Sequence, residues 1–409
     1  MLQAVDLHLH SRHASAVSPA MTLPGIARVA QVKGLDVLST GDCLQPQWLA
    51  TIAATLVPAE PGCWALNERT REAVAAEVPA HLRRELRFVL GTEVSCVPPG
   101  TREIEGLHHL VYFSSLDDVR RFRERIAACG NLEEGRPVLS LSSRQLLEQV
   151  LALNSDAHLV PAHIFNPWFS VLGTVGGGYT LEDAFGDLTP RLCAIETGLT
   201  SIPPMCRRVA SLDRFNLFSC SDAHSLENLA REYTLVDTAP GYAALFAALR
   251  SGTPGEVRGT VKFPLERTRY YRNRCTHCQR SFGGKKCPRC GRALVMGSHD
   301  RLEEIATRSE PAELDNSPPF QQLLPLAHVI ADLQQADRTS TGVLRLQQRL
   351  LQALGSERFI LTEATAEAIS EVGTKTLARA IVRQRTMPPG ALPADDDVPA
   401  GDDQLPLGI

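Results

Sequence analysis

The sequence predicts an α/β barrel of about seven strand–helix units, followed by a small cysteine module and a helical region. Short apolar runs alternate with helix-like stretches over residues 1–262, the pattern of repeated β-α units. Nearly every apolar run ends in His, Asp or Glu, and side chains at the carboxyl ends of barrel strands converge on one rim. Four cysteines then form one tight cluster, ahead of a charged stretch with helical periodicity.

Length and composition set the expected domain boundaries. The 409 residues exceed the size at which one hydrophobic core stops growing, so we expect several domains. The barrel is expected over 1–262, the cysteine module over 263–297, the helical region over 298–390 and a tail over 391–409. The last 19 residues hold five Asp and no basic residue, which predicts a disordered acidic segment.

Neither a membrane span nor a signal peptide is expected. No apolar run approaches the roughly 18 residues that a spanning helix needs. The N-terminus lacks a charged segment followed by an apolar core. We therefore expect a soluble cytoplasmic protein, in which the seven cysteines outside the cluster are reduced and buried.

The predicted barrel strands carry an array of candidate metal ligands. The strand candidates are AVDLHLH (4–10), LDVLSTGD (35–42), RFVLGTE (87–93), LHHLVYF (107–113), HLVPAH (158–163), LCAIET (192–197) and NLFSCSDAH (216–224). Their polar end residues are Asp6, His8, His10, Asp42, Glu93, His108, His109, His163, Glu196, Asp222 and His224. Imidazole and carboxylate without thiolate suit a catalytic Zn²⁺ or Mn²⁺ site, and so many ligands suggest more than one ion. Such clusters hydrolyse phosphoesters.

Over residues 6–224 the HxH, GxE, single-His and DxH motifs resemble those of the PHP (polymerase and histidinol phosphatase) family. The resemblance implies a distorted (β/α)7 barrel with a phosphoesterase site of two or three Zn²⁺, Mn²⁺ or Mg²⁺ ions. It implies the following ligands: His8, His10, Glu93 and Asp222 for the first ion, Glu93, His163 and His108 for the second, Asp42 and His224 for a third. His108 is preferred to His109, since neighbours on a strand face opposite sides. The catalytic set is His8, His10, Glu93, His163, Asp222 and His224.

The cysteine cluster has the spacing of a zinc ribbon. Cys275-x2-Cys278 and Cys287-x2-Cys290 are two knuckles that together supply four thiolates to one tetrahedral Zn²⁺. In a cytoplasmic chain this spacing favours metal binding over two disulfides.

A basic segment overlaps the predicted ribbon. Nine Lys or Arg and no acidic residue lie between Arg267 and Arg292, although the whole chain has a net charge of −4. The candidate DNA-binding residues are Arg267, Arg269, Tyr270, Tyr271, Arg272, Arg274, Arg280, Lys285, Lys286, Arg289 and Arg292. Phosphates would meet the cations while bases stack on the rings. The alternative is a solvated basic face whose aromatic residues pack around the zinc.

The combination resembles the endonuclease Q family of PHP-type nucleases over roughly residues 1–385. The motifs that carry the resemblance are LSTGDCLQPQWL, PAHIFNPWFSVLG, EDAFGDLTP, AIETGLTSIPPM, SDAHS and CTHC…CPRCG. The resemblance implies hydrolysis of the phosphodiester 5′ to deoxyuridine, hypoxanthine, xanthine or an abasic site. An extruded nucleotide would need a pocket, for which Phe165, Trp168 and Phe169 are candidates, with core packing as the alternative.

Two weaker signals lie near the C-terminus. ISEVGTKTLARAIVRQR resembles half of a helix-hairpin-helix that holds a DNA phosphate, or else forms an ordinary amphipathic helix pair. The last six residues resemble a peptide that binds the bacterial sliding clamp, with Gln404, Leu405, Leu407 and Ile409 as its contacts.

The leading hypothesis from sequence is thus a lesion-directed DNA endonuclease associated with the nucleoid. A PHP phosphatase that acts on a small phosphate ester would share the metal site. This alternative gives no reason for the ribbon, the basic segment or the tail. A non-catalytic DNA-repair scaffold would not need the full ligand set.

Overall fold

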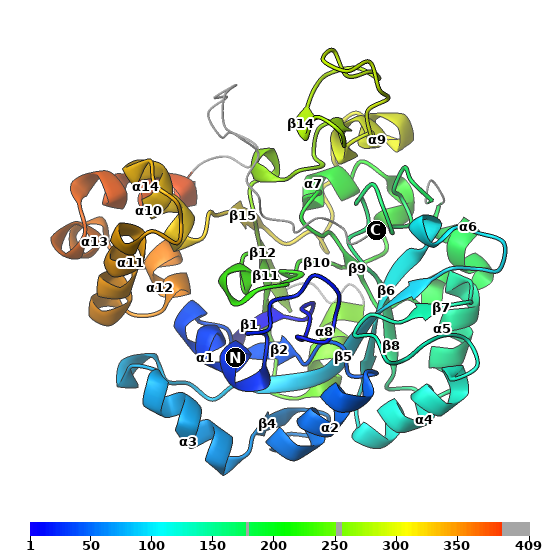
Figure 1. Ribbon diagram of the computed structural model, residues 1–409, viewed down its shortest axis with the longest axis horizontal. Helices are drawn as coiled ribbons and strands as arrows, with labels where there is room; N and C mark the ends of the chain where they lie inside the picture. Colours follow the sequence, from blue (N-terminus) through cyan, green and yellow to red (C-terminus); the bar gives the residue numbers. More distant parts are fainter. Residues whose placement is uncertain (177–179, 251–255, 387–409) are drawn as a thin grey trace.

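The computed structural model describes residues 1–176, 180–250 and 256–386. The predicted acidic tail over 391–409, with its clamp-binding peptide, lies outside the described residues. The fold is mixed α/β (Figure 1).

The strands form one large sheet and two small ones. In the 11-stranded sheet the order is β15-β12-β11-β1-β2-β5-β4-β3, with β6 and β7 pairing with β5, and β8 with β6. Its strands are β1 (Leu2–Asp6), β2 (Val37–Ser39), β3 (Leu56–Pro58), β4 (Trp64–Leu66), β5 (Arg87–Cys96), β6 (Leu107–Phe113), β7 (Val138–Leu139), β8 (His158–Pro161), β11 (Tyr233–Asp237), β12 (Val257–Lys262) and β15 (Phe320–Gln322). The two-stranded sheets are β9 (Ile195–Glu196) with β10 (Leu217–Phe218), and β13 (Arg274–Cys275) with β14 (Arg280–Ser281).

All seven predicted strands are present, as β1, β2, β5, β6, β8, β9 and β10. Repeated β-α units would make all neighbouring strands parallel, and the observed strand directions depart from this pattern. The β1–β2, β2–β5 and β9–β10 pairs are parallel, but β6 runs antiparallel to both β5 and β8. Closure into a seven-unit barrel stays a prediction. The sequence analysis did not identify β11 and β12, which extend the sheet beyond β1: β11 is antiparallel to β1, and β12 is antiparallel to β11.

The helices begin and end where local chemistry favours it. In α1 the Thr22 hydroxyl accepts a hydrogen bond from the Gly25 N–H, and Gly34 ends the helix in a left-handed conformation. The helices outside the C-terminal region are α1 (Leu23–Lys33), α2 (Pro46–Thr55), α3 (Glu68–Glu77), α4 (Leu116–Ile126), α5 (Ser143–Leu151), α6 (Leu181–Phe185), α7 (Pro203–Cys206), α8 (Tyr242–Arg250) and α9 (Ser298–Ile305).

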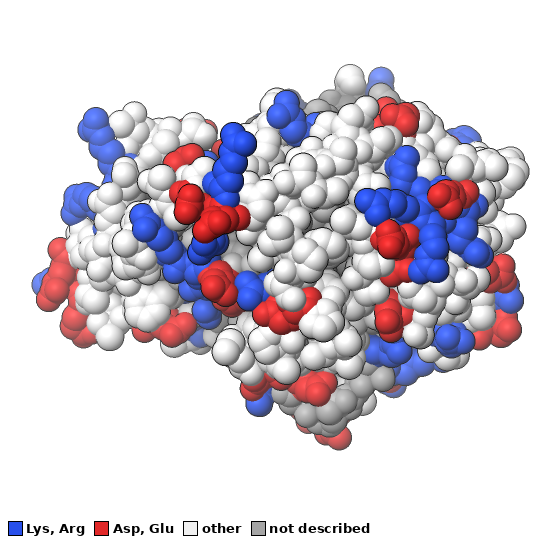
Figure 2. Space-filling view, turned by 90° about the horizontal axis from the view of Figure 1, so that it is seen from below, with Lys and Arg blue, Asp and Glu red and all other residues white. Residues whose placement is uncertain are grey.

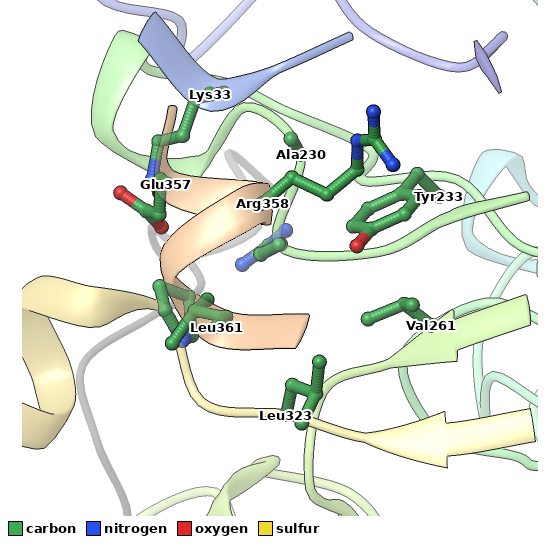
Figure 3. Close-up of a pocket in the computed structure, with 10 residues that line it drawn as sticks. Lys33, Ala230, Tyr233, Val261, Leu323, Glu357, Arg358 and Leu361 are labelled. Atoms are coloured by element: carbon green, nitrogen blue, oxygen red, sulfur yellow. Dashed lines mark hydrogen bonds and ion pairs between the residues drawn. The ribbon is translucent and has the colours of Figure 1, made fainter. Parts of the chain in front are cut away.

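The C-terminal helices gather on one side of the central strands (Figure 1). They are α10 (Leu326–Gln334), α11 (Thr341–Leu354), α12 (Glu357–Thr362), α13 (Ala366–Val372) and α14 (Lys375–Thr386). The buried Lys33 ammonium of α1 pairs with the Glu357 carboxylate of α12 at 2.8 Å. A small pocket lies beside this pair, with Tyr233 and Val261 on its sheet side (Figure 3). The pair therefore fixes the helices against α1 and the sheet.

Charge is mixed on the face that lies at the bottom of Figure 1. Figure 2 shows groups of Lys and Arg interspersed with Asp and Glu there, separated by a broad uncharged surface. Arg120 and Asp117 of α4, for example, form an exposed ion pair at 2.7 Å. Such a face offers no continuous basic surface to DNA. Among the helices of the described residues, none has the length and apolar character of a membrane span.

Candidate metal centre and nucleic-acid interface

Two groups of potential metal ligands lie at the ends of the central strands. One consists of His8, His10 and Asp222, and the other of Glu93, His108 and His163; within each group the ligand atoms lie within 4.8 Å of one another. Chain segments that are distant in sequence are therefore brought together as the strand-end pattern predicted.

The Glu93 carboxylate connects the two groups. Its Oε1 lies 2.9 Å from His108 Nδ1 and 3.1 Å from His163 Nε2. Its Oε2 lies 3.4 Å from His10 Nε2 and 3.2 Å from the Arg136 guanidinium. A carboxylate in this position can serve both groups at once.

His8 and His10 are oriented by carboxylates behind them. His8 Nδ1 lies 2.9 Å from Glu196 Oε1, and His10 Nδ1 lies 3.0 Å from Asp42 Oδ1. The buried Nε2 atom of each ring has no hydrogen-bond partner among the described residues. Both Nε2 atoms face Asp222 Oδ1, at 3.4 and 3.3 Å. A histidine held by a carboxylate at one nitrogen, with no hydrogen bond at the other, is typical of metal ligation, so the donor set fits divalent ions.

Asp42, expected as a third-metal ligand, has both oxygens in hydrogen bonds: Oδ1 lies 3.0 Å from His10 Nδ1, and Oδ2 accepts from the Ser11 N–H at 2.6 Å. It lies outside the two ligand groups and orients the His10 ring, and its part in a third metal site stays a prediction. His224 lies beside this pair, with its ring 4.5 Å from the His10 ring and its Nδ1 3.0 Å from the Asp222 carbonyl oxygen. The Asp222 and His224 side chains are 19% and 25% exposed, so they mark the open side of the site.

Electrostatics tie these groups together. Burial disfavours the His8 imidazolium, but Glu196, Asp222 and Glu93 outweigh burial and raise the pKa of His8 well above its usual value. Burial also opposes ionisation of Glu93, yet His108 and Arg136 bring its pKa well below the usual value. For His108, burial dominates and lowers the pKa to about 4. Glu93 thus stays ionised and requires positive partners, which metal ions can supply.

Strand register explains which of the adjacent histidines enters the site. In the antiparallel β5–β6 pair His108 lies opposite Ser95, two residues from Glu93 and on the same face, whereas His109 lies opposite Val94. His109 Nε2 instead bonds the Ser143 hydroxyl at 2.8 Å. The structure accordingly places His108, and not His109, in the ligand group, as the sequence analysis preferred.

Several site residues have left-handed backbones that L-residues rarely adopt. The φ angles are +46° at Asp42, +29° at His163 and +47° at Asp222. Next to His163 stands Gly198, at which a Cβ would lie 2.4 Å from the His163 Cβ. Strain of this kind clusters at functional sites, where surrounding contacts hold it in place.

Some site residues were missed or left without a role by sequence reasoning. Glu196 was noted at a strand end but given no role. Its Oε1 lies 2.9 Å from His8 Nδ1, and its Oε2 accepts a hydrogen bond from the His163 N–H at 2.7 Å. Arg136 was missed, because it lies in a loop rather than at a strand end. Arg231 was also missed; its guanidinium donates to the carbonyl oxygens of Ser221 and Asp222, at 2.8 and 3.2 Å.

The four cysteines gather as their spacing predicted. The sulfurs of Cys275 and Cys290 lie 3.5 Å apart and those of Cys278 and Cys287 lie 3.8 Å apart, with all four within 4.8 Å. Bonded disulfide sulfurs would be far closer, at about 2.05 Å. A tetrahedral ion with about 2.3 Å bonds to sulfur separates its ligands by about 3.8 Å. The cluster therefore fits one zinc ion.

The basic segment is only partly exposed. Its exposed cations are Arg272, Arg280, Lys285, Lys286, Arg289 and Arg292. Arg274 departs from the expectation, because its side chain is buried and its backbone pairs with Val295, so it does not face a DNA backbone here. Arg267 is tied to Asp332 at 2.6 Å, and Arg269 is half-buried. Of the two tyrosines, Tyr270 packs edge-on against Trp168 at 4.4 Å and Tyr271 against His299.

The candidate pocket aromatics separate into two kinds. Phe169 stacks on His108 with ring centroids 4.5 Å apart and an interplanar angle of 9°, beside the ligand groups. Trp168 joins the site to the ribbon through Tyr270. Phe165 is buried in the main apolar cluster, which agrees with the core-packing alternative.

Comparison with known proteins adds independent information. No family model matches the chain. The crystal structure of the lesion-specific endonuclease PfuEndoQ from Pyrococcus furiosus superposes with a TM-score of 0.80 and 30% identity, covering 94% of this chain and 91% of that chain. A crystal structure of endonuclease Q in complex with a 27-mer duplex substrate, which carries an abasic lesion at the active site, superposes with a TM-score of 0.81 and 29% identity. The match covers 94% of this chain and 92% of that chain. The uncharacterized protein YqxK of Bacillus subtilis is 25% identical, covering 93% of this chain and 94% of its own.

The cysteine cluster gives a direct test. We expect Cys287→Ser to lower the bound zinc by about one ion per chain, because a four-thiolate site holds one ion and does not close with three. The 275–290 segment should lose its fold while the rest of the protein stays folded, since zinc supplies much of the folding free energy of such modules. Elemental analysis and limited proteolysis measure both effects. The buried Cys206, which lies outside the cluster, provides the control Cys206→Ser; equal zinc in all three proteins would contradict the assignment.

Proposed function

Because the chain belongs to the endonuclease Q family, we propose that it is a metal-dependent DNA endonuclease directed to lesions. It hydrolyses the phosphodiester 5′ to deaminated bases, namely deoxyuridine, hypoxanthine and xanthine, or to abasic sites. The observation that carries this proposal is the pair of buried ligand groups connected by Glu93, in which the His8 and His10 Nε2 atoms face carboxylates but have no hydrogen-bond partner among the described residues.

The proposed architecture follows the family. Residues 1–262 form a distorted (β/α)7 barrel of PHP type, residues 263–297 the zinc ribbon, and residues 298–390 the helical region. A DNA substrate places the protein in the cytoplasm with the nucleoid.

We propose that two or three Zn²⁺, Mn²⁺ or Mg²⁺ ions bind this site. The ligands are His8, His10, Glu93 and Asp222 for one ion, with His108 and His163 joining Glu93 for another; His224 stands at the open side. Ions in such a site polarise the phosphodiester and activate water for attack.

The chain's own residues supply orientation and access. Glu196 and Asp42 hold the imidazoles of His8 and His10 so that each presents Nε2 to the site. Substrate enters from the side of Asp222 and His224, the more exposed members. Phe169, which stacks on His108, and Trp168 are the proposed stacking partners of an extruded nucleotide.

The exposed cations of the ribbon form the proposed duplex contact. Arg272, Lys285 and Arg289 are exposed, and no ion pair to an acidic side chain is found for them among the described residues. Phosphate contacts by such residues fix the duplex without reading its sequence. Arg274 is left out of the proposed contact because it is buried.

Two other functions remain testable alternatives. A phosphatase would hydrolyse p-nitrophenyl phosphate but leave a duplex with one deoxyuridine intact, and a scaffold would bind the duplex without cutting it. The pure protein is incubated with each substrate, and denaturing electrophoresis shows whether the lesion strand is cut on the 5′ side.

The C-terminal peptide, outside the described residues, is proposed to bind the bacterial sliding clamp. Its alternating Leu405, Leu407 and Ile409 can enter one hydrophobic groove while Gln404 makes a polar contact. The five Asp of the tail would repel phosphate, which favours a protein partner over DNA.

Asp222→Asn should abolish strand cleavage while DNA binding persists. The change removes a charge that holds metal, and several kcal/mol of lost stabilisation corresponds to a rate reduction of about 10³-fold or more. Asn tolerates the left-handed backbone at this position, so the fold should survive. Cleavage is measured on an abasic duplex beside the exposed control Asp117→Asn; a wild-type rate for Asp222→Asn would overturn the metal assignment.

Affinity for undamaged duplex should fall steeply with salt. Replacing Arg272 and Arg289 with Ala should flatten the log–log slope by about two, because each phosphate contact releases about one condensed counterion. Fluorescence anisotropy at several salt concentrations gives the slope. The pair Arg102→Ala and Arg120→Ala, exposed cations outside the ribbon, serves as the control. An unchanged slope would move the DNA path away from the ribbon.

Deleting residues 404–409 should leave cleavage of a short oligonucleotide unchanged and remove binding to the sliding clamp. Binding of the intact peptide is expected on the order of micromolar, because the entropy lost when a short peptide is ordered on binding offsets much of its contact free energy. Calorimetry with purified clamp measures it. Equal binding by the two forms, or none by either, would reject the clamp proposal and leave the nuclease proposal untouched.

A further inference from the structure

Arg136 is a cation at the metal centre to which no role has been given. One of its terminal nitrogens lies 3.2 Å from Glu93 Oε2, the carboxylate that joins the two ligand groups. Its side chain remains 27% exposed, whereas the Glu93 side chain is only 1% exposed. The Arg136 side chain therefore extends from solvent to the buried carboxylate.

The loop that carries Arg136 is fastened to the segments that carry the ligands. Three hydrogen bonds hold it: Gln45 Nε2 to the Glu133 carbonyl (3.2 Å), the Gly135 N–H to the His13 carbonyl (3.1 Å), and the Ser95 N–H to the Pro137 carbonyl (3.0 Å). A Cβ at Gly135 would lie 2.6 Å from the Ala14 nitrogen, so the loop packs too closely for a side chain there. Pro137 further restricts the backbone of Arg136. The guanidinium is thus held in place before substrate arrives.

Arg136 has donors left over. A guanidinium offers five N–H groups in a planar fork, and in the described part of the chain Glu93 is the partner found for the Arg136 side chain. The fork matches two oxygens of a phosphate, and it can hold Glu93 and a phosphate at the same time.

The charge of the site makes this cation useful. The carboxylates of Glu93 and Asp222 face the histidine Nε2 atoms, and those of Asp42 and Glu196 lie behind the rings, so an anionic phosphodiester must approach a group of negative charges. The 3.2 Å contact with Glu93 places Arg136 beside the second ligand group, since Glu93 also contacts His108 and His163.

We propose that Arg136 binds the non-bridging oxygens of the scissile phosphate, a role that rests on the proposed nuclease function. The other possibility is a positioning role, in which Arg136 only fixes Glu93. The two differ in one respect: a phosphate-binding arginine responds to the charge of the substrate, and a positioning arginine does not.

The test compares Arg136→Gln, Arg136→Lys and the distant control Arg120→Gln in the metal-loaded full-length protein. Each is assayed on an abasic duplex whose scissile phosphate is either native or an uncharged methylphosphonate, with kcat and KM determined separately. Arg136→Gln should lose about 10²–10³-fold in kcat/KM on the native duplex, the usual effect of removing one transition-state donor. Its deficit on the methylphosphonate should be much smaller, and Arg136→Lys should recover part of the rate on the native duplex.

Two further measurements do not depend on cleavage. Metal content by elemental analysis should be unchanged in Arg136→Gln, whereas loss of metal would show that Arg136 only positions Glu93 and would overturn the proposal. Calorimetry with inorganic phosphate should show binding weakened by about tenfold or more, the loss expected for a hydrogen bond to a charged group.

The outcomes separate the two proposals. Equal deficits on both duplexes, or unchanged phosphate affinity, would overturn the role of Arg136 even if the wild type cuts the lesion strand. If the wild type leaves the lesion duplex intact, the nuclease function fails, and the phosphate-binding measurement still decides whether Arg136 binds the anion.

Discussion

The buried carboxylate of Glu93 is the constraint on which the site depends. Removing a carboxylate from water costs several kcal/mol unless partners compensate. Here His108, His163, His10 and Arg136 surround it within 3.4 Å, and they come from separate parts of the chain. The strands must close around this group in one arrangement, because any other would leave its charge buried without partners. The positions of the two ligand groups follow from that requirement.

Much of this site could be predicted because its chemistry lies at strand ends. The sequence shows an apolar run that leads into His8 and His10, and another that leads into Asp222. Each run predicts a strand, and the polar residues at its end predict a ligand position. Tertiary contacts could not be predicted in this way. Asp42 stands at a strand end like the ligands, yet its two oxygens are taken by His10 and the Ser11 N–H. Arg136 belongs to a loop without periodicity, and only the packed structure brings it to Glu93.

The fold shows the same division between local and non-local information. All seven apolar runs contain a strand, since their apolar residues are buried and most of the runs include Val, Ile or Thr. Their direction was not local information: β6 is antiparallel to its neighbours, where repeated β-α units would have made it parallel. Likewise, spacing predicted the gathering of the cysteines, but charge counting did not reveal that Arg274 is buried while Arg272 is exposed.

The left-handed backbones at His163 and Asp222 have a consequence for the life of the protein in the cell. Each such conformation costs on the order of 1–3 kcal/mol, and the repulsion among the ionised carboxylates adds to it. An ion that binds the folded chain and not the unfolded one offsets this cost by mass action. With the proposed metal site, metal supply would set abundance as well as catalysis, since a starved cell would hold a population that unfolds more often and is degraded sooner.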